Sequence, residues 1–297
     1  MSVILYQEKS FIVAFKPHGI ATVPLKKQLH SGADSNTDAT DKTLLGLAAG
    51  ECPDILKVTG RNSWEYGTLH RLDTATAGLV VFAKTQEFYD FLMKIQAEGS
   101  FVKTYLARTF RSGRLMIMDA DEKLYRGETV KIMSYFRSYG KGSKEVRAVQ
   151  DIKRADSPVL YSTEITLKQK GSETEISHNA ERGQDVADAL EDFPAHAVNR
   201  FLKAHSQSAQ LCQSGFGDIF ECAITRGFRH QIRAHLACIG HPIIGDGLYG
   251  KDGPDSFASE AVTAEAGTSV TADNFMHLLC FKVSFPLPDG SCFTFSS

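Results

Sequence analysis

Short apolar runs at the start of the chain predict a pair of β-strands. The opening stretch VILYQEKSFIVAFKPHG is rich in β-branched and aromatic residues, and polar residues 8–10 interrupt it as a turn would. A third apolar run, residues 78–84, has the length and composition of a buried strand. Strands are also predicted in KTYLARTF, in GDIFECAIT and in a closing hairpin that turns at residues 288–290.

Helical spacing marks three other segments. Residues 86–98 place apolar side chains three or four positions apart, and the leucines of residues 44–47 indicate a shorter helix. Ile232, Leu236 and Ile239 recur at the spacing of one helix face, and the Gly-x-Pro sequence at residues 240–242 ends that helix.

The remaining segments have a less regular pattern. Residues 123–136 and 158–170 read as strands, whereas residues 26–42, 169–210 and 250–274 are interpreted as loops or insertions. Strands and helices without regular βαβ alternation favour an α+β fold, with a mixed, largely antiparallel central sheet, flanking helices and a cleft. The chain of 297 residues is therefore predicted to be a single domain, 1–297, that carries these insertions.

Composition excludes several protein classes. The chain is 42% hydrophobic and 23% charged, as ordinary globular proteins are. Its first residues lack the pattern of a signal peptide, and no apolar run reaches the ~18 residues of a membrane span. The six cysteines form no CxxC pair, so we expect reduced thiols in a soluble, cytoplasmic protein.

A net charge of −2 conceals a strong local imbalance. Residues 101–154 hold thirteen Lys and Arg against six Asp and Glu, whereas residues 171–192 hold seven acidic residues and one arginine. A locally positive surface of this kind can bind a polyanion. A solvated face with charges of both signs explains the same pattern equally well.

Two short segments combine residues that can do chemistry. His70, Arg71 and Asp73 lie in LHRLDTATAG, before a predicted strand, where a carboxylate beside a guanidinium stays ionised and can act as nucleophile or base. The alternative is a plain turn in which Asp73 accepts backbone amides. In GFRHQIRAH, Arg229 and Arg233 are expected on one helix face, facing a phosphate or carboxylate, or only solvent.

Two further features are weaker when taken alone. The ring of Tyr105, in Lys103-Thr104-Tyr105, could stack on a base, but core packing is the commoner reason for an isolated aromatic residue. His235 and Cys238 are three residues apart and could face one side of a helix, yet two ligands without a second pair are weak support for a metal site.

Together the motifs resemble the RluA-type pseudouridine synthase family. HRLDTATAG is similar to the family's HRLDxxTSG nucleophile loop, KTYLA to its K-x-Y-x-A strand, and HQIRAHLACIGHPIIGDGLYG to its HQ-[IL]-R-x-H-L-x-x-x-G-H-P-[IL]-x-G-D-x-x-Y motif. The opening strand pair and the closing FMHLLCFKVSFPLPDG also resemble the family's ends. Two departures stand out: Ala77 replaces a serine, and Gly227-Phe228-Arg229-His230 moves the arginine of G-R-x-H-Q by one position.

The resemblance implies a pseudouridine synthase catalytic fold that isomerises specific uridines in structured rRNA or tRNA. Asp73 would be the nucleophile, attacking C1′ or C6 of a flipped uracil. Arg233 would keep Asp73 ionised through an ion pair, and Tyr105 would stack on the uracil and assist proton removal at C5. No metal or organic cofactor is implied, because the leaving base is also the incoming nucleophile.

The resemblance also implies residues that contact the substrate. Arg71 would fill the space left by the extruded nucleotide or bind its phosphate. The other expected substrate-binding residues are His70, Arg229, His230, Gln231 and Ile232. Many relatives carry an N-terminal S4 RNA-binding domain, but here the catalytic strands begin by Val3, so we expect no S4 domain, and we expect a monomer that binds no membrane.

Two other function classes stay open. An RNA-binding pseudoenzyme or RNA-folding chaperone would share the fold, although it would not need Asp73, Tyr105 and Arg233 together. A metal-dependent nuclease using His230, His235 and Asp246 is weaker, because the family's turn motif already accounts for those residues.

Overall fold

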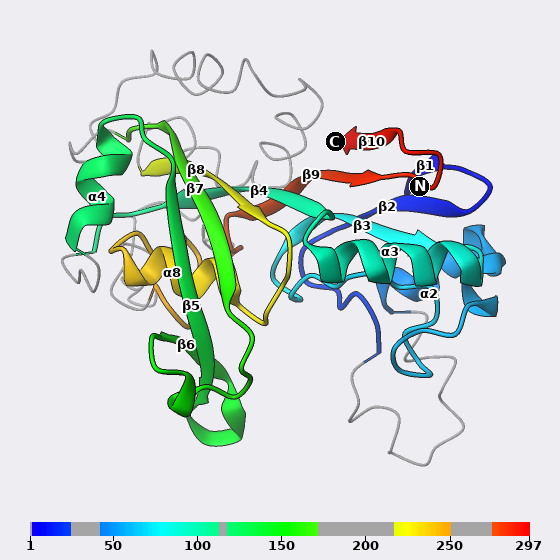
Figure 1. Cartoon of the computed structure of the whole chain (residues 1–297), viewed down its shortest axis with the longest axis horizontal. Coiled ribbons are helices and arrows are strands. Elements are labelled where there is room, and N and C mark those ends of the chain that lie inside the picture. Colours follow the sequence, from blue (N-terminus) through cyan, green and yellow to red (C-terminus); the bar gives the residue numbers. More distant parts are fainter. Residues whose placement is uncertain (1, 25–41, 113–117, 172–216, 251–274) are drawn as a thin grey trace, which may run out of the picture. The chain divides into compact units, whose positions relative to one another are not determined.

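The computed structural model describes residues 2–24, 42–112, 118–171, 217–250 and 275–297 (Figure 1). They belong to two units, one formed by residues 1–103 with 280–297 and the other by residues 104–279. Each unit is described separately. Within the described ranges no helix is both long and apolar enough to cross a bilayer.

The first unit is built on antiparallel strands. Strands β1 (Ile4–Gln7) and β2 (Phe11–Lys16) pair across the predicted turn, and β2 pairs with β3 (Ala77–Ala83) in the register Val13↔Val81. The chain closes with β9 (Leu278–Pro286) and β10 (Cys292–Ser296), whose hairpin confirms the predicted turn at residues 288–290. The strand order is β1-β2-β3-β9, with β10 on β9.

Two capped helices pack on these strands. Helix α2 (Leu44–Glu51) begins where Thr43 Oγ1 accepts from Gly46 N, and a 3-10 helix (Pro53–Lys57) follows it. Helix α3 (Gln86–Glu98) begins where Thr85 Oγ1 accepts from Phe88 N, and ends in the left-handed backbone of Gly99. The rings of Phe88 and Phe11 stack 4.8 Å apart, which joins the apolar face of α3 to β2.

The strands of the second unit follow the order β4-β8-β7-β5-β6. They are β4 (Val102–Thr109), β5 (Val130–Tyr139), β6 (Glu145–Val149), β7 (Tyr161–Gln169) and β8 (Asp218–Ile224). Strand β5 changes partner along its length, because residues 130–134 pair with β7 and residues 135–139 with β6, all antiparallel. The helices are α4 (Met118–Tyr125) and α8 (Gln231–Cys238), with 3-10 turns at Lys141–Ser143 and Ile152–Arg154.

The structure corrects one predicted element. Residues 123–136 were expected to form a strand, but residues 123–125 belong to α4, in which Ala120 and Leu124 lie one helical turn apart and are both buried. Gly127 then adopts a positive φ of 82°, and the strand begins only at Val130. All but one residue of each expected loop, 26–42 and 250–274, and most of the insertion at 169–210 lie outside the described residues.

The two ends of this insertion lie side by side. Strands β7 and β8 form an antiparallel pair that extends to Gln169↔Ile219. A Cβ atom on Gly171 would lie 2.5 Å from the backbone carbon of Gly217, and Gly171 N donates to Asp218 Oδ1 over 2.8 Å. Residues 172–216 therefore leave and rejoin the second unit at neighbouring points.

Candidate functional site

Asp73 lies on a loop that residues 16–22 hold in place. Thr22 Oγ1 donates to the Leu72 carbonyl oxygen (3.0 Å) and accepts from Leu72 N (3.1 Å). Gly19 N donates to the Thr74 carbonyl oxygen over 2.9 Å. These bonds fix the backbone on both sides of Asp73, whose side chain is half-buried rather than solvated like that of an ordinary surface turn.

Lys16 lies beneath this loop with its side chain fully buried. Its ammonium donates to the carbonyl oxygens of Pro17 (2.9 Å), Ile20 (2.7 Å) and Thr74 (3.1 Å). Burial lowers the pKa of Lys16 to about 7, and the negative charge of Asp73 opposes that shift. The loop of the expected nucleophile thus contains a buried cation close enough to feel its charge.

The strand that follows the loop requires a glycine. Gly78 has a φ of +125°, and a Cβ atom there would lie 2.2 Å from the carbonyl oxygen of Cys280. The neighbouring Ala77 is fully buried, so the family's serine is replaced here by a small apolar residue in a packed strand. The glycine of the TAG sequence therefore permits the close approach of β3, directly after the Asp73 loop, to β9.

The structure places His70 and Arg71 in different environments. His70 is buried, its Nε2 accepts from Val81 N (3.2 Å), and its ring lies edge-on to Phe101. Burial lowers the pKa of His70 well below its usual value, so the ring is neutral. Arg71 is exposed and pairs with Glu65 over 2.8 Å. Contact of either residue with a substrate stays a prediction.

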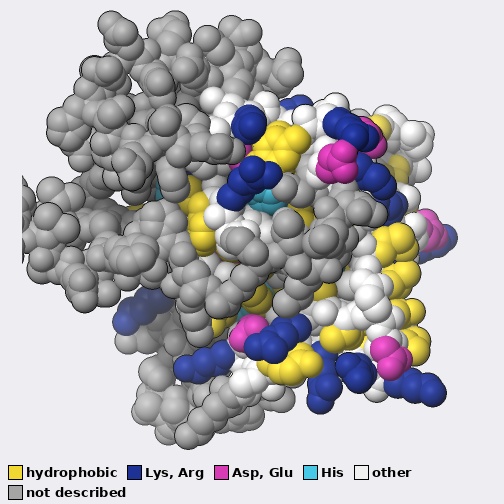
Figure 2. Space-filling model, turned by 90° about the vertical axis from the view of Figure 1, so that its left-hand side faces the viewer, with side chains coloured by type: hydrophobic (Ala, Val, Ile, Leu, Met, Phe, Trp, Pro, Cys, Tyr) yellow, Lys and Arg dark blue, Asp and Glu magenta, His cyan; other side chains and the backbone are white. Residues whose placement is uncertain are grey.

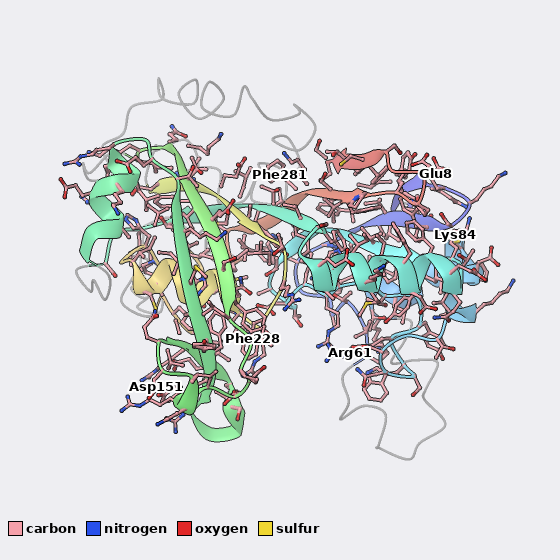
Figure 3. All side chains as sticks on the ribbon, in the orientation of Figure 1. Glu8, Arg61, Lys84, Asp151, Phe228 and Phe281 are labelled. Carbon is pink, nitrogen blue, oxygen red and sulfur yellow. The ribbon has the colours of Figure 1, made fainter. Side chains whose placement is uncertain are left out.

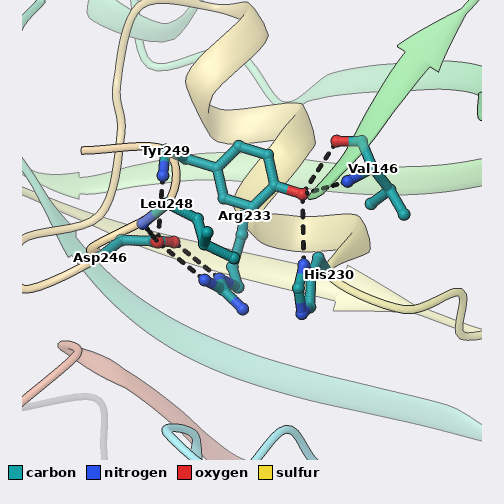
Figure 4. Close-up of polar contacts among 6 residues, drawn as sticks. All are labelled: Val146, His230, Arg233, Asp246, Leu248 and Tyr249. Atoms are coloured by element: carbon teal, nitrogen blue, oxygen red, sulfur yellow. Dashed lines mark hydrogen bonds and ion pairs between the residues drawn. The ribbon is translucent and has the colours of Figure 1, made fainter. Parts of the chain in front are cut away.

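Arg233 forms a buried, bidentate ion pair (Figure 4). Its Nε donates to Asp246 Oδ2 and its Nη2 to Asp246 Oδ1, each over 2.7 Å, and the two side chains are 8% and 0% exposed. Oδ1 also accepts from the backbone N–H groups of Leu248 and Tyr249. The carboxylate therefore fixes the planar guanidinium in one orientation. The ion pair with Asp73 that the resemblance implies stays a prediction.

Tyr249 links this pair to the strands. Its hydroxyl donates to the Val146 carbonyl oxygen (2.8 Å), accepts from Val146 N (2.9 Å) and lies 3.3 Å from His230 Nδ1. Burial raises the pKa of Tyr249 to about 12, and its ring centroid lies 5.2 Å from the guanidinium carbon of Arg233. His230, at the helix N-terminus, has a left-handed backbone with a φ of 56°.

Helix α8 is anchored by a buried polar network. His235 bonds through Nε2 to Ser134 Oγ and through Nδ1 to Thr163 Oγ1, both over 2.8 Å. Gln231 Nε2 donates to the same Thr163 hydroxyl (3.1 Å) and to the Ser162 carbonyl oxygen (2.9 Å). Burial lowers the pKa of His235 to about 3, so the ring is neutral. Both ring nitrogens are in use, which argues against a metal site shared with Cys238.

The expected arrangement of Arg229 and Arg233 on one helix face is wrong. Helix α8 begins at Gln231, so Arg229 precedes it and is exposed, whereas Arg233 is buried. The Gly-Phe-Arg-His order has a packing reason, because the Phe228 ring stacks on Phe136 at 4.9 Å with an interplanar angle of 6°. Ile232 is buried on α8, as its helical spacing predicted.

Tyr105 lies on β4 and is 5% exposed. The neighbouring Lys103 is also buried, which lowers its pKa to about 8. The predicted site residues therefore divide between the units: Asp73, His70 and Arg71 in the first, and Tyr105, Arg229, His230, Gln231, Ile232 and Arg233 in the second.

Sequence reasoning missed three residues of the site. Lys16 was read only as the end of a strand, and Asp246 only as a weak metal ligand. Tyr249 was seen only as part of a motif. The only signal for these residues in the sequence was their place in the motifs KPHG and GDGLY. The type of a single residue does not reveal which buried partner it contacts.

Comparison with known proteins identifies relatives. The sequence profile described as RNA pseudouridylate synthase matches residues 10–238. Ribosomal large subunit pseudouridine synthase D of Nitrosomonas europaea is 25% identical over 259 residues, covering 87% of this chain but 53% of that protein. Dual-specificity RNA pseudouridine synthase RluA of Yersinia pestis is 24% identical over 281 residues, covering 94% of this chain and 98% of that protein.

A solved structure supports the same fold. Human RNA Pseudouridylate Synthase Domain Containing 1 superposes with a TM-score of 0.52 at 15% identity, covering 99% of this chain and 82% of the human one. The predicted α+β fold with a mostly antiparallel sheet is thereby confirmed. The chain spans about half the length of several of the bacterial relatives it matches, such as the 53% of the Nitrosomonas protein.

Proposed function

The chain belongs to the RNA pseudouridylate synthase family, and on that premise we propose that it converts specific uridines of ribosomal or transfer RNA to pseudouridine. In this reaction the bond between N1 of uracil and C1′ breaks, and the base turns. A bond from C5 to C1′ forms, the C5 proton leaves and N1 gains a proton. The reaction is a balanced isomerisation that consumes no cofactor.

The main support for this proposal is the loop that holds Asp73, because its backbone is fixed by hydrogen bonds. A nucleophilic carboxylate has to stay ionised and hold its position while a flipped base enters. Both flanking peptides of Asp73 are hydrogen-bonded to residues 16–22, and Lys16 lies near enough for the two charges to interact. A plain surface turn would have no need of a buried lysine beneath it.

The second unit supplies the other proposed roles. Arg233 would stabilise the carboxylate of Asp73, and the bidentate bond to Asp246 holds its guanidinium in one orientation. Tyr105 would stack on the uracil and assist loss of the C5 proton. Its position in a strand, almost fully buried, restricts the ring to few orientations.

Replacing Asp73 with asparagine tests the proposal. Asp73→Asn keeps the size of the side chain but removes the nucleophile, so pseudouridine formation should fall below detection while RNA affinity and the melting temperature stay near wild type. Unmodified transcripts of large-subunit rRNA and tRNA serve as substrates, and pseudouridine is mapped by carbodiimide-based primer extension. Asp54→Asn, at an exposed carboxylate paired with Lys57, is the matched control.

Two results would contradict this function. Activity of Asp73→Asn within about tenfold of wild type would remove Asp73 as nucleophile. A wild-type protein that binds these RNAs tightly but forms no pseudouridine in any of them would favour the RNA-binding module instead.

A further inference from the structure

The β5–β6 hairpin has an inner and an outer face. On the inner face, Phe136 stacks on Phe228 and its ring lies 5.0 Å from that of His235, so this side packs on α8. Residues of opposite parity point the other way. We define the outer face of the hairpin by the paired residues Tyr135 and Val149, Arg137 and Arg147, and Tyr139 and Glu145.

Two arginines lie directly opposite each other on this outer face. Arg137 of β5 is the register partner of Arg147 of β6, and both are exposed. Like charges at directly opposed positions destabilise a strand pair. An anion that binds both guanidiniums would relieve this repulsion.

The neighbouring side chains hold the two guanidiniums in place. The ring centroid of Tyr139 lies 5.2 Å from the guanidinium carbon of Arg137 and 4.5 Å from that of Arg147. Glu145 accepts from Arg147 Nε over 2.8 Å, which supplies one negative charge for two positive ones. The outer face therefore has a net positive charge and a fixed geometry.

The surroundings favour a long polyanion. Residues 137–154 contain six Lys and Arg against two Asp and Glu, and Asp151, labelled in Figure 3, lies just beyond β6. Figure 2 shows Lys and Arg side chains recurring over the described part of one face of the molecule. Repeated phosphates of an RNA strand can meet several such cations, whereas an acidic protein patch presents fewer charges at fixed spacing.

We propose that the outer face of the β5–β6 hairpin binds the RNA backbone, with one phosphate held between Arg137 and Arg147 and Tyr139 supporting both guanidiniums. The identity of the polyanion rests on the proposed function. The surface lies on the side of the hairpin opposite to α8, which carries Arg233, so it contacts RNA beyond the target nucleotide.

The full-length double variant Arg137→Gln with Arg147→Gln tests this surface. Its affinity for a fluorescein-labelled 20-nucleotide single-stranded RNA, measured by anisotropy, should fall about tenfold near 0.1 M salt. The slope of log affinity against log salt should flatten by about 0.7, the value for one lost phosphate contact on a single strand. Tyr139→Phe should bind as wild type does, and Tyr139→Ala should weaken binding.

A matched control removes the same charge elsewhere. Lys57→Gln with Lys94→Gln loses two exposed, ion-paired lysines of the first unit and should leave the salt slope unchanged. Thermal unfolding of each variant, with a melting temperature near wild type, shows that the binding change is not a loss of fold.

Specific outcomes would overturn the proposal. Unchanged RNA affinity and slope in the folded arginine double variant would do so, as would an equal loss in the lysine control. Retained RNA binding with loss of an acidic protein partner would assign the surface to protein instead. Pseudouridine formation by the wild type is measured separately. If the wild type forms no pseudouridine but the arginine variant binds RNA more weakly, the proposed function is wrong and the RNA-binding surface is supported.

Discussion

At Tyr105 the proposed roles of the ring, stacking, and of the hydroxyl, proton transfer, can be tested separately. Tyr105→Phe keeps the ring in its buried position on β4 but removes the hydroxyl, so uridine isomerisation should slow by roughly 10²-fold or more if the hydroxyl takes part in proton transfer. RNA affinity should change little. Single-turnover kinetics on an unmodified transcript measures the step.

Two comparisons make this prediction specific. Tyr105→Leu should be slower than Tyr105→Phe, because it also loses the aromatic face; equal rates would contradict a stacking role. Tyr6→Phe, on β1, removes a hydroxyl that donates to Glu8 and should leave the rate unchanged.

Lys16 shows what sequence can and cannot reveal about a single residue. The KPHG sequence marks the end of a strand, and local pattern says no more. Its three carbonyl partners include Thr74, 58 positions away. Such a contact depends on how β2 and the Asp73 loop meet in space, which only the family motif could suggest. The same is true of Asp246, whose partner Arg233 lies on a different element.

Helix α8 couples stability to pH through a buried histidine. His235 has a pKa of about 3 in the folded protein, because burial disfavours its charged form, against about 6.5 when unfolded. Between these values the unfolded chain binds a proton that the folded chain does not, so the free energy of unfolding falls as pH decreases from 6.5 towards 3. At pH 5 the loss from this residue should be about 2 kcal/mol relative to pH 8.

His235→Gln should remove that part of the pH dependence. Gln can still bond to Ser134 or Thr163 but does not titrate, so its loss of unfolding free energy from pH 8 to pH 5 should be about 2 kcal/mol smaller than that of wild type. Urea denaturation at both pH values measures it. His70 is present in both proteins, and its contribution cancels. Equal losses in the two proteins would contradict the neutral, buried state of His235.

Helices and strands with a strong local sequence pattern could be predicted. Those that depend on contacts with residues distant in the sequence could not. Helix α3 follows the predicted range 86–98, since its apolar spacing and its Thr85 cap are both local. Strand β6 escaped prediction because Val146 is its one buried side chain, and the backbone of Val146 is held by Tyr249, 103 positions away. Residues 123–125 were wrongly predicted as a strand, because a few apolar positions fit both the helical and the strand periodicity.

For the whole molecule, the joined ends of the insertion predict that residues 172–216 can be removed. Gly171 and Gly217 are in backbone contact, so an Asn-Gly linker should close the β7–β8 hairpin. Shortening the connection from 45 residues to two lowers the loop-closure entropy by up to about 3 kcal/mol, so stability should not fall. Removing seven acidic and three basic residues should also strengthen RNA binding.

A second variant separates length from charge. Replacing the seven acidic residues of residues 171–192 with Asn and Gln keeps the segment at full length, so it should raise RNA affinity without the gain in unfolding free energy. Chemical denaturation and RNA anisotropy measure the two effects. If the deletion abolishes folding, residues 172–216 belong to the core and the insertion prediction fails.

The contact between Gly171 and Gly217 also sets an order of events during synthesis. Strand β7 can pair with β5 as soon as it leaves the ribosome, because Val130↔Ile165 joins segments already made. Its other edge has to wait for β8, since Gln169 and Ile219 are 50 positions apart. At about 5–20 residues per second this interval is roughly 3–10 s. For that time the nascent chain exposes an unpaired strand edge, the kind of surface that chaperones shield and that aggregation begins from.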